Sequence, residues 1–250
     1  MLDNDKISVQ LYTVREALAA DLDGTLARLA AMGLRQVEPF GLTDVADALA
    51  AALPAHGLTA PSTHARIVGG DVDAVLAAAA KTGTTLVIEP HVDRSRWTTE
   101  ADVAAIAAEL NAAAAKAADA GVTIGYHNHE FELEQKIGGR AALEVLADHL
   151  DASVALEVDT YWAVVGGVDV PELLGRLGSR VKAVHLKDGD GTRDTKKQVA
   201  LGEGVLDIPA ILAASSGVEL GVIELDDTSG DVFEAVAGGV RYLTAAGTGA

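Results

Sequence analysis

The segment GYHNHEFE, residues 125–132, packs two histidines and two glutamates into six positions directly after the apolar residues 122–124. Neutral imidazole binds divalent metals or transfers protons near neutral pH, and carboxylates bind hard cations or act as bases. Packing alone rarely requires such a cluster. The segment therefore predicts acid–base or metal chemistry at the end of a strand.

The chain is long enough and apolar enough to bury a sizeable core. It has 250 residues, of which 49% are hydrophobic, and its mean hydropathy is +0.23. No linker interrupts the sequence, so we expect a single domain over residues 1–250. The absence of cysteine excludes disulfides and thiolate metal sites, which leaves His, Asp and Glu as the strong metal ligands.

The charge balance is strongly acidic, with 19 Lys and Arg against 37 Asp and Glu, a net charge of −18 and a pI of about 4.6. This charge repels nucleic acid, and a neutral ligand or a cation is easier to accommodate than an anion. No apolar run approaches the roughly 20 residues that span a bilayer, so we expect no membrane insertion. No secretory signal is visible, so we expect a cytoplasmic protein. The sequence leaves a homo-oligomer open.

Short β-branched apolar runs alternate with longer Ala- and Leu-rich amphipathic runs along the whole chain. The expected strands cover residues 7–10, 36–38, 59–63, 85–89, 122–126, 154–158, 181–185 and 221–225. The expected helices cover residues 23–32, 44–56, 71–82, 99–120, 139–150, 170–177, 207–216 and 229–244.

Eight strand–helix units in 250 residues predict an α/β fold, a single (β/α)₈ barrel, because parallel strands need helical crossovers. Glycines such as Gly33, Gly57 and Gly83 stand where helices should end. An open doubly wound sheet is less favoured, because no Gly-rich dinucleotide fingerprint follows the first strand. In a barrel of this kind the active site lies where strands end and the following loops begin.

Almost every expected strand ends in a polar or ionisable group. These groups are Gln10, Tyr12, Glu38, His64, Glu89, His91, His127, His129, Glu132, Glu157, Asp159, His185, Lys187, Glu224 and Asp226. The barrel brings all the strand ends to one mouth, where unpaired carboxylates would repel one another unless a divalent cation bound them. Asp159, His185 and Glu224 form a mixed set of O and N ligands suited to Mn, Mg, Co or Zn.

Six motifs recur in the order typical of one known group of barrels. They are VQLYTVR at 9–15, HNHEFE at 127–132, EVDT at 157–160, VHLKD at 184–188, LGEG at 201–204 and IELD at 223–226. With this set, nearly the whole chain resembles the xylose isomerase-like barrels, which include sugar-phosphate isomerases/epimerases, ketose 3-epimerases and inosose dehydratases.

The resemblance implies one divalent metal ion, most often Mn, held by a Glu/Asp/His/Glu set from the last four strands. Asp159, His185 and Glu224 match three of these ligands. His127 stands where the family has its fifth-strand Glu. Either His127 is the fourth ligand, or Glu132 reaches in from the loop and leaves His127 free as an acid or base. We expect Glu132, because it preserves the charge of the ligand set.

The resemblance also implies proton abstraction next to a carbonyl, with the metal stabilising an enediolate. Glu224 would be one acid/base, and His127 or Glu38 the other, with Lys187 bonded to a substrate hydroxyl or carbonyl. Two opposed bases give a sugar isomerase or epimerase. A base with an acid beside a leaving group gives a lyase, which would dehydrate an inosose or cleave a 3-keto-glycoside by β-elimination.

The expected substrate contacts are Gln10, His64, His91, His129, Trp162 and Glu203. An indole can stack on the apolar face of a sugar, and Glu203 lies between two glycines that favour a tight loop at the mouth. No Gly-rich phosphate cradle follows the last two strands, so we expect an unphosphorylated carbohydrate.

Two other classes of protein remain as alternatives. An endonuclease IV-like phosphodiesterase shares this barrel, but the charge of −18 weighs against DNA binding. A non-catalytic sugar-binding barrel would lose its metal ligands, and this chain retains Asp159, His185 and Glu224.

Overall fold

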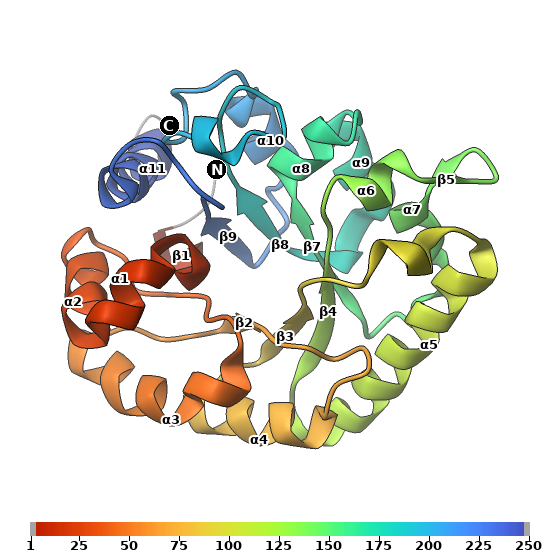
Figure 1. Cartoon of the computed structure of the whole chain (residues 1–250), viewed down its shortest axis with the longest axis horizontal. Coiled ribbons are helices and arrows are strands. Elements are labelled where there is room, and N and C mark those ends of the chain that lie inside the picture. Colours follow the sequence, from red (N-terminus) through yellow and green to blue (C-terminus); the bar gives the residue numbers. More distant parts are fainter. Residues whose placement is uncertain (1–3, 248–250) are drawn as a thin grey trace.

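A computed structural model describes residues 4–247 (Figure 1). Its main sheet is parallel and curls into a barrel, with the strands in the order β1-β9-β8-β7-β4-β3-β2. These strands are β1 Ile7–Val9, β2 Ser62–His64, β3 Leu86–Glu89, β4 Thr123–His127, β7 Ala155–Asp159, β8 Val181–Leu186 and β9 Leu220–Ile223. The predicted α/β barrel is confirmed, and seven of the eight expected strands overlap these seven.

The remaining expected strand, residues 36–38, closes the barrel between β1 and β2 without forming a regular strand. Isolated parallel pairs join this segment to both neighbours: Gln10 with Glu38, Gln36 with Thr59, and Phe40 with His64. Pro39 has no N–H to donate, which interrupts the ladder, although its carbonyl accepts from His64 N at 2.8 Å.

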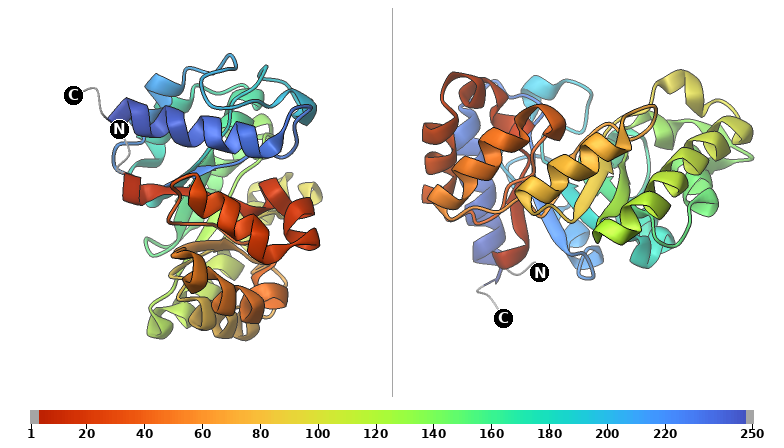
Figure 2. Two further views of the ribbon diagram at one scale, coloured as in Figure 1. Left: turned by 90° about the vertical axis from the view of Figure 1, so that its left-hand side faces the viewer. Right: turned by 90° about the horizontal axis from the view of Figure 1, so that it is seen from below.

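Helices surround the barrel, as the two further views in Figure 2 show. The helices that follow the expected pattern are α2 Leu22–Ala31, α3 Leu42–Ala52, α4 Val72–Thr82, α5 Glu100–Ala117, α7 Ala142–His149, α9 Val170–Leu177, α10 Ile208–Ala214 and α11 Val232–Gly247. The short helices α1 Arg15–Ala20, α6 Phe131–Glu134 and α8 Thr160–Val165, and the hairpin β5 Lys136–Ile137 and β6 Arg140–Ala141, were not predicted. No helix within residues 4–247 is long and apolar enough to cross a membrane.

The sequence folds this way because alternate strand residues face two different cores. In β8, Val184 and Leu186 join the large cluster between sheet and helices, whereas Ala183 faces the barrel interior. The interior cluster contains Leu86, Ile88, Ala155, Ala183, Leu220 and Val222. Strands β3, β7, β8 and β9 thus supply the apolar barrel interior, and the last inward positions of the strands are free to carry polar groups toward the mouth.

Candidate active site at the mouth of the barrel

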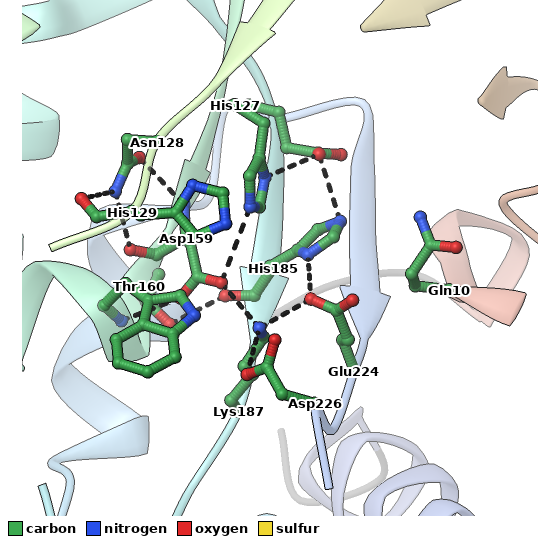
Figure 3. A network of polar contacts seen from close by, with 12 residues as sticks. Gln10, His127, Asn128, His129, Asp159, Thr160, His185, Lys187, Glu224 and Asp226 are labelled. Atoms are coloured by element: carbon green, nitrogen blue, oxygen red, sulfur yellow. Dashed lines mark hydrogen bonds and ion pairs between the residues drawn. The ribbon is translucent and has the colours of Figure 1, made fainter. Parts of the chain in front are cut away.

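The inward positions at the ends of four neighbouring strands carry the ionisable cluster. His127 ends β4, Asp159 ends β7, His185 is the fifth residue of β8, and Glu224 directly follows β9. Strand register places Asp159 opposite His185. Figure 3 shows these four side chains pointing toward one another, and each is at most 5% exposed.

Two overlapping groups have ligand atoms that all lie within 4.8 Å of one another. The first group is His127, Asp159, His185 and Glu224, and the second is His64, His127, Glu157 and His185. Both share His127 and His185. Each is a mixed N and O donor set, which suits first-row divalent metals.

The members of the second group are held together by direct contacts with one carboxylate oxygen. Glu157 Oε2 lies 2.7 Å from His64 Nε2, 3.0 Å from His127 Nδ1 and 3.0 Å from His185 Nε2. One carboxylate oxygen therefore fills the space between three imidazoles. Burial holds the pKa of His127 well below its ordinary value, so its ring is neutral. His127 Nδ1 contacts Glu157, and the other ring nitrogen of His127, Nε2, lies 3.8 Å from Asp159 Oδ2.

The first group combines two carboxylates with two imidazoles and therefore fits a divalent ion. Asp159 and Glu224 are two carboxylates, and the Lys187 ammonium, which lies between them, also contacts Asp226. Burial raises the pKa of Asp159 to about 6, which shows how poorly this environment solvates its charge. Buried anionic oxygens beside two imidazoles are a donor set that a divalent ion would bind.

Glu132, the expected fourth ligand, lies outside both groups. Its Oε1 accepts from the Tyr126 hydroxyl at 2.7 Å, and its Oε2 accepts from His129 N at 2.8 Å. Burial raises the pKa of Glu132 to about 8. Because Glu132 sits in the short helix α6, its side chain folds back onto its own loop. The geometry does not support Glu132 as a ligand, whereas His127 lies in both groups that could hold a metal ion.

Glu38 and Gln10 lie beneath the mouth. Gln10 Nε2 donates to Glu38 Oε1 at 2.9 Å, Ser62 Oγ donates to Glu38 Oε2, and His185 Nε2 lies 2.8 Å from Glu38 Oε1. Both residues are fully buried and line none of the main cavities. The geometry therefore does not support Gln10 as a substrate contact or Glu38 as a base that touches substrate.

A cavity of about 440 Å³ opens above the cluster. It is lined by Tyr12, Phe40, Gly41, His64, Ala65, Arg66, Pro90, His91, His127, His129, Glu224 and Asp226. The expected substrate contacts His64, His91 and His129 thus face one space, together with His127 and Glu224. Its size is within the range of small-molecule sites.

Two other expected contacts lie differently. Trp162 is buried beside the cluster, with its ring 5.8 Å from Lys187 Nζ and 6.5 Å from the His129 ring, and its Nε1 makes no hydrogen bond. Glu203 is exposed and does not line the cavity. Its loop is held by the neighbouring glycines instead, because Gly202 N and Gly204 N donate to the Asp188 carboxylate.

Sequence reasoning assigned no role to Glu157, Asp188 or Asp226. Glu157 stands two residues before Asp159, and this spacing alone places both side chains on the inward face of β7. The role of Asp188 could have been found from the VHLKD and LGEG motifs. The Asp188 carboxylate can accept hydrogen bonds, and the backbone N–H groups of Gly202 and Gly204 can donate them without hindrance from a side chain.

A family model for the xylose isomerase-like TIM barrel matches residues 17–214. Among solved structures, a sugar phosphate isomerase/epimerase from Parabacteroides distasonis superposes with a TM-score of 0.85 at 23% identity, covering 98% of this chain and 95% of that one. A search of curated proteins finds no match.

Two further structures share the fold. One is a probable 3-DHS dehydratase, AsbF, from Bacillus anthracis, with a TM-score of 0.74, 12% identity, and coverage of 96% of this chain and 98% of that one. The other is the IolI protein with a bound zinc atom, with a TM-score of 0.69, 15% identity, and coverage of 96% and 97%. At these identities the structures establish the fold alone, and the family match over residues 17–214 establishes membership. The chain belongs to the xylose isomerase-like TIM barrel family.

Proposed function

We propose that this protein is a divalent-metal-dependent sugar isomerase or epimerase that abstracts a proton next to a carbonyl. One observation carries the proposal: His127, Asp159, His185 and Glu224 lie within ligand distance of one another at the ends of four neighbouring barrel strands. They stand beneath a cavity that His64, His91 and His129 also line. The proposed substrate is a small, unphosphorylated carbohydrate.

The four ligands supply two imidazole nitrogens and two carboxylates, which suit Mn²⁺, Mg²⁺, Co²⁺ or Zn²⁺, and the family resemblance makes Mn²⁺ the proposed ion. A bound ion would polarise substrate oxygens and stabilise the developing enediolate. Glu157 orients two of these ligands, because its carboxylate contacts both His127 Nδ1 and His185 Nε2. Such hydrogen bonds fix the ring orientation of a ligating histidine.

Glu224 and His64 are the proposed acid and base. Both line the cavity, so both can reach a substrate, whereas Glu38 lies too deep. His64 replaces Glu38 in this role because His64 lines the cavity. Its ring is held in place by contacts of Nε2 with Glu157 at 2.7 Å and with Glu38 at 3.3 Å. His91 and His129 line the cavity and remain as donors to substrate hydroxyl or carbonyl groups, whereas the expected donor Lys187 is buried and does not line it.

A lyase acting by β-elimination is the second candidate. It is favoured by the number of imidazoles at the cavity, since a general acid would then be available beside a leaving group as well as a base beside the carbon acid. An inosose or a 3-keto-glycoside has the carbonyl that this chemistry needs.

Proton exchange into deuterated water tests the proposal across ketoses, inososes and 3-keto-glycosides with Mn²⁺ present. We expect exchange at the carbon next to the carbonyl, and a loss of at least about 100-fold in Glu224→Gln. Glu203→Gln is the matched control and should retain the rate, because Glu203 is exposed and outside the cavity. Equal rates in both variants would overturn the role of Glu224. Release of a leaving group would distinguish the lyase from the epimerase.

A further inference from the structure

Lys187 is a buried cation among the proposed metal ligands. Its side chain is 1% exposed, and Nζ lies 2.9 Å from Asp159 Oδ2, 2.6 Å from Glu224 Oε2 and 2.8 Å from Asp226 Oδ2. Three carboxylates therefore surround one ammonium. Asp159 and Glu224 also belong to the group proposed to hold the divalent ion.

The ammonium and a divalent ion compete for these two carboxylates. Glu224 Oε2 already contacts both Lys187 Nζ and His185 Nδ1, the latter at 2.7 Å. Like charges at contact distance repel strongly where water cannot screen them. An ion coordinated by Asp159 and Glu224 would therefore displace Nζ from both.

Asp226 is the partner that can keep Lys187 in place. Its Oδ2 accepts from Gln198 Nε2 at 2.8 Å, and its backbone N donates to Gln198 Oε1 at 2.7 Å. Gln198 is fully buried, so this carboxylate is held firmly, and Asp226 lies outside both metal groups. A divalent ion would balance Asp159 and Glu224, and Lys187 would balance Asp226.

We propose that Lys187 sets the metal affinity of this site as a built-in competitor: it pairs with Asp159 and Glu224 until a divalent ion binds, and then with Asp226 alone. The inference rests on the proposed metal group. Asp226 lines the cavity and its side chain is 24% exposed, so a Lys187 Nζ paired with Asp226 alone would lie beside the cavity.

Calorimetric titration of the purified full-length protein with Mn²⁺ tests the competition. We expect Lys187→Met and Lys187→Gln to bind Mn²⁺ at least about tenfold more tightly than the wild type, because the competing charge is gone. Lys197→Met is the matched control: Lys197 pairs with Asp190 and its side chain is 57% exposed, so its charge is screened and the affinity should change by less than about twofold. Unchanged or weaker binding in folded Lys187 variants overturns the inference.

The crystal structure of the wild-type protein, from crystals soaked in Mn²⁺, gives a second test that does not depend on whether the variants fold. We expect Nζ to be bonded to Asp226 and to have left Asp159 and Glu224. If the ion is bound by the four proposed ligands while Nζ still contacts both carboxylates, the inference about Lys187 is wrong and the proposed metal group stands. If the ion is bound elsewhere, or if no ion is bound, the proposed metal group fails together with it.

Discussion

His129 keeps a neutral imidazole beside a strongly charged cluster. Burial, with the nearby Lys187 ammonium, lowers the pKa of His129 from 6.5 to about 4. A base whose folded pKa is depressed stays neutral in the folded state, while the unfolded chain takes up a proton below pH 6.5. The free energy of unfolding therefore falls as the pH drops from 6.5 toward 4, by about 3 kcal/mol for this group.

Urea unfolding at pH 7 and pH 4, with EDTA present, measures this effect. We expect His129→Gln to lose about 3 kcal/mol less than the wild type over this interval, because glutamine does not titrate. His149→Gln is the control, since His149 lies outside the cavity at the end of α7. If His129→Gln and the wild type lose the same free energy of unfolding between pH 7 and pH 4, the buried, neutral His129 is contradicted.

The strand-end residues could be predicted because their placement depends only on period-two alternation. Asp159, His185 and Glu224 follow directly from the ends of three strands, and all three lie in one group. The choice between His127 and Glu132 could not be predicted, because it depends on a turn. Glu132 folds back onto Tyr126 and His129 N, and no sequence pattern specifies these hydrogen bonds in advance.

At the scale of elements, Asp188 organises the loop that follows β8. Its two oxygens accept from four backbone N–H groups, those of Gly189, Gly202, Gly204 and Leu206, at 2.9 to 3.2 Å. Its side chain is fully buried, so these bonds replace water entirely. This residue therefore fixes the loop of residues 200–206 against the barrel.

We expect Asp188→Asn to lower the free energy of unfolding by about 2 kcal/mol, because an amide offers one acceptor oxygen where the carboxylate offers two. Urea unfolding measures the loss, and hydrogen exchange at Gly202 and Gly204 should become faster. Asp190→Asn is the control, since Asp190 lies in the same loop near the surface and bonds Thr192. Equal stability of the two variants would refute this role for Asp188.

A second variant, which adds a methyl group instead of changing Asp188, tests the same loop. A Cβ on Gly204 would overlap Asp188 Oδ1 and the Gly189 backbone, so Gly204→Ala should displace the loop without removing any acceptor. Gly217→Ala is the control, because nothing lies within 4 Å of a Cβ there.

Element prediction was reliable where the pattern was long. The longer expected helices and seven expected strands overlap observed elements, since an apolar face repeated over several turns fixes the element type. It was weakest for short elements at the mouth, such as α6 and α8. A helix of four to six residues has too few turns to show a period, and its formation depends on capping contacts such as Asp159 Oδ1 with Trp162 N at 2.8 Å.

At the scale of the whole molecule, the barrel brings to one mouth side chains that are far apart in the chain. His64 and Glu157 are 93 positions apart and bond at 2.7 Å, and Glu38 and His185 are 147 apart and bond at 2.8 Å. The sequence predicted this convergence once eight strand–helix units were recognised. It could not predict the depth of each residue, which is why Glu38 and Gln10 were expected at the substrate and lie beneath it.

The most direct test of the proposed metal centre is the metal content of the protein after equilibration with Mn²⁺ and gel filtration, together with the Mn²⁺ affinity from calorimetric titration. We expect about one equivalent per chain in the wild type, and a fall of at least about tenfold in affinity for both Asp159→Asn and His185→Ala. His56→Ala should match the wild type, because His56 pairs with Asp23 away from the cluster. If Asp159→Asn and His185→Ala both retain the wild-type equivalent and affinity, the proposed metal centre is wrong.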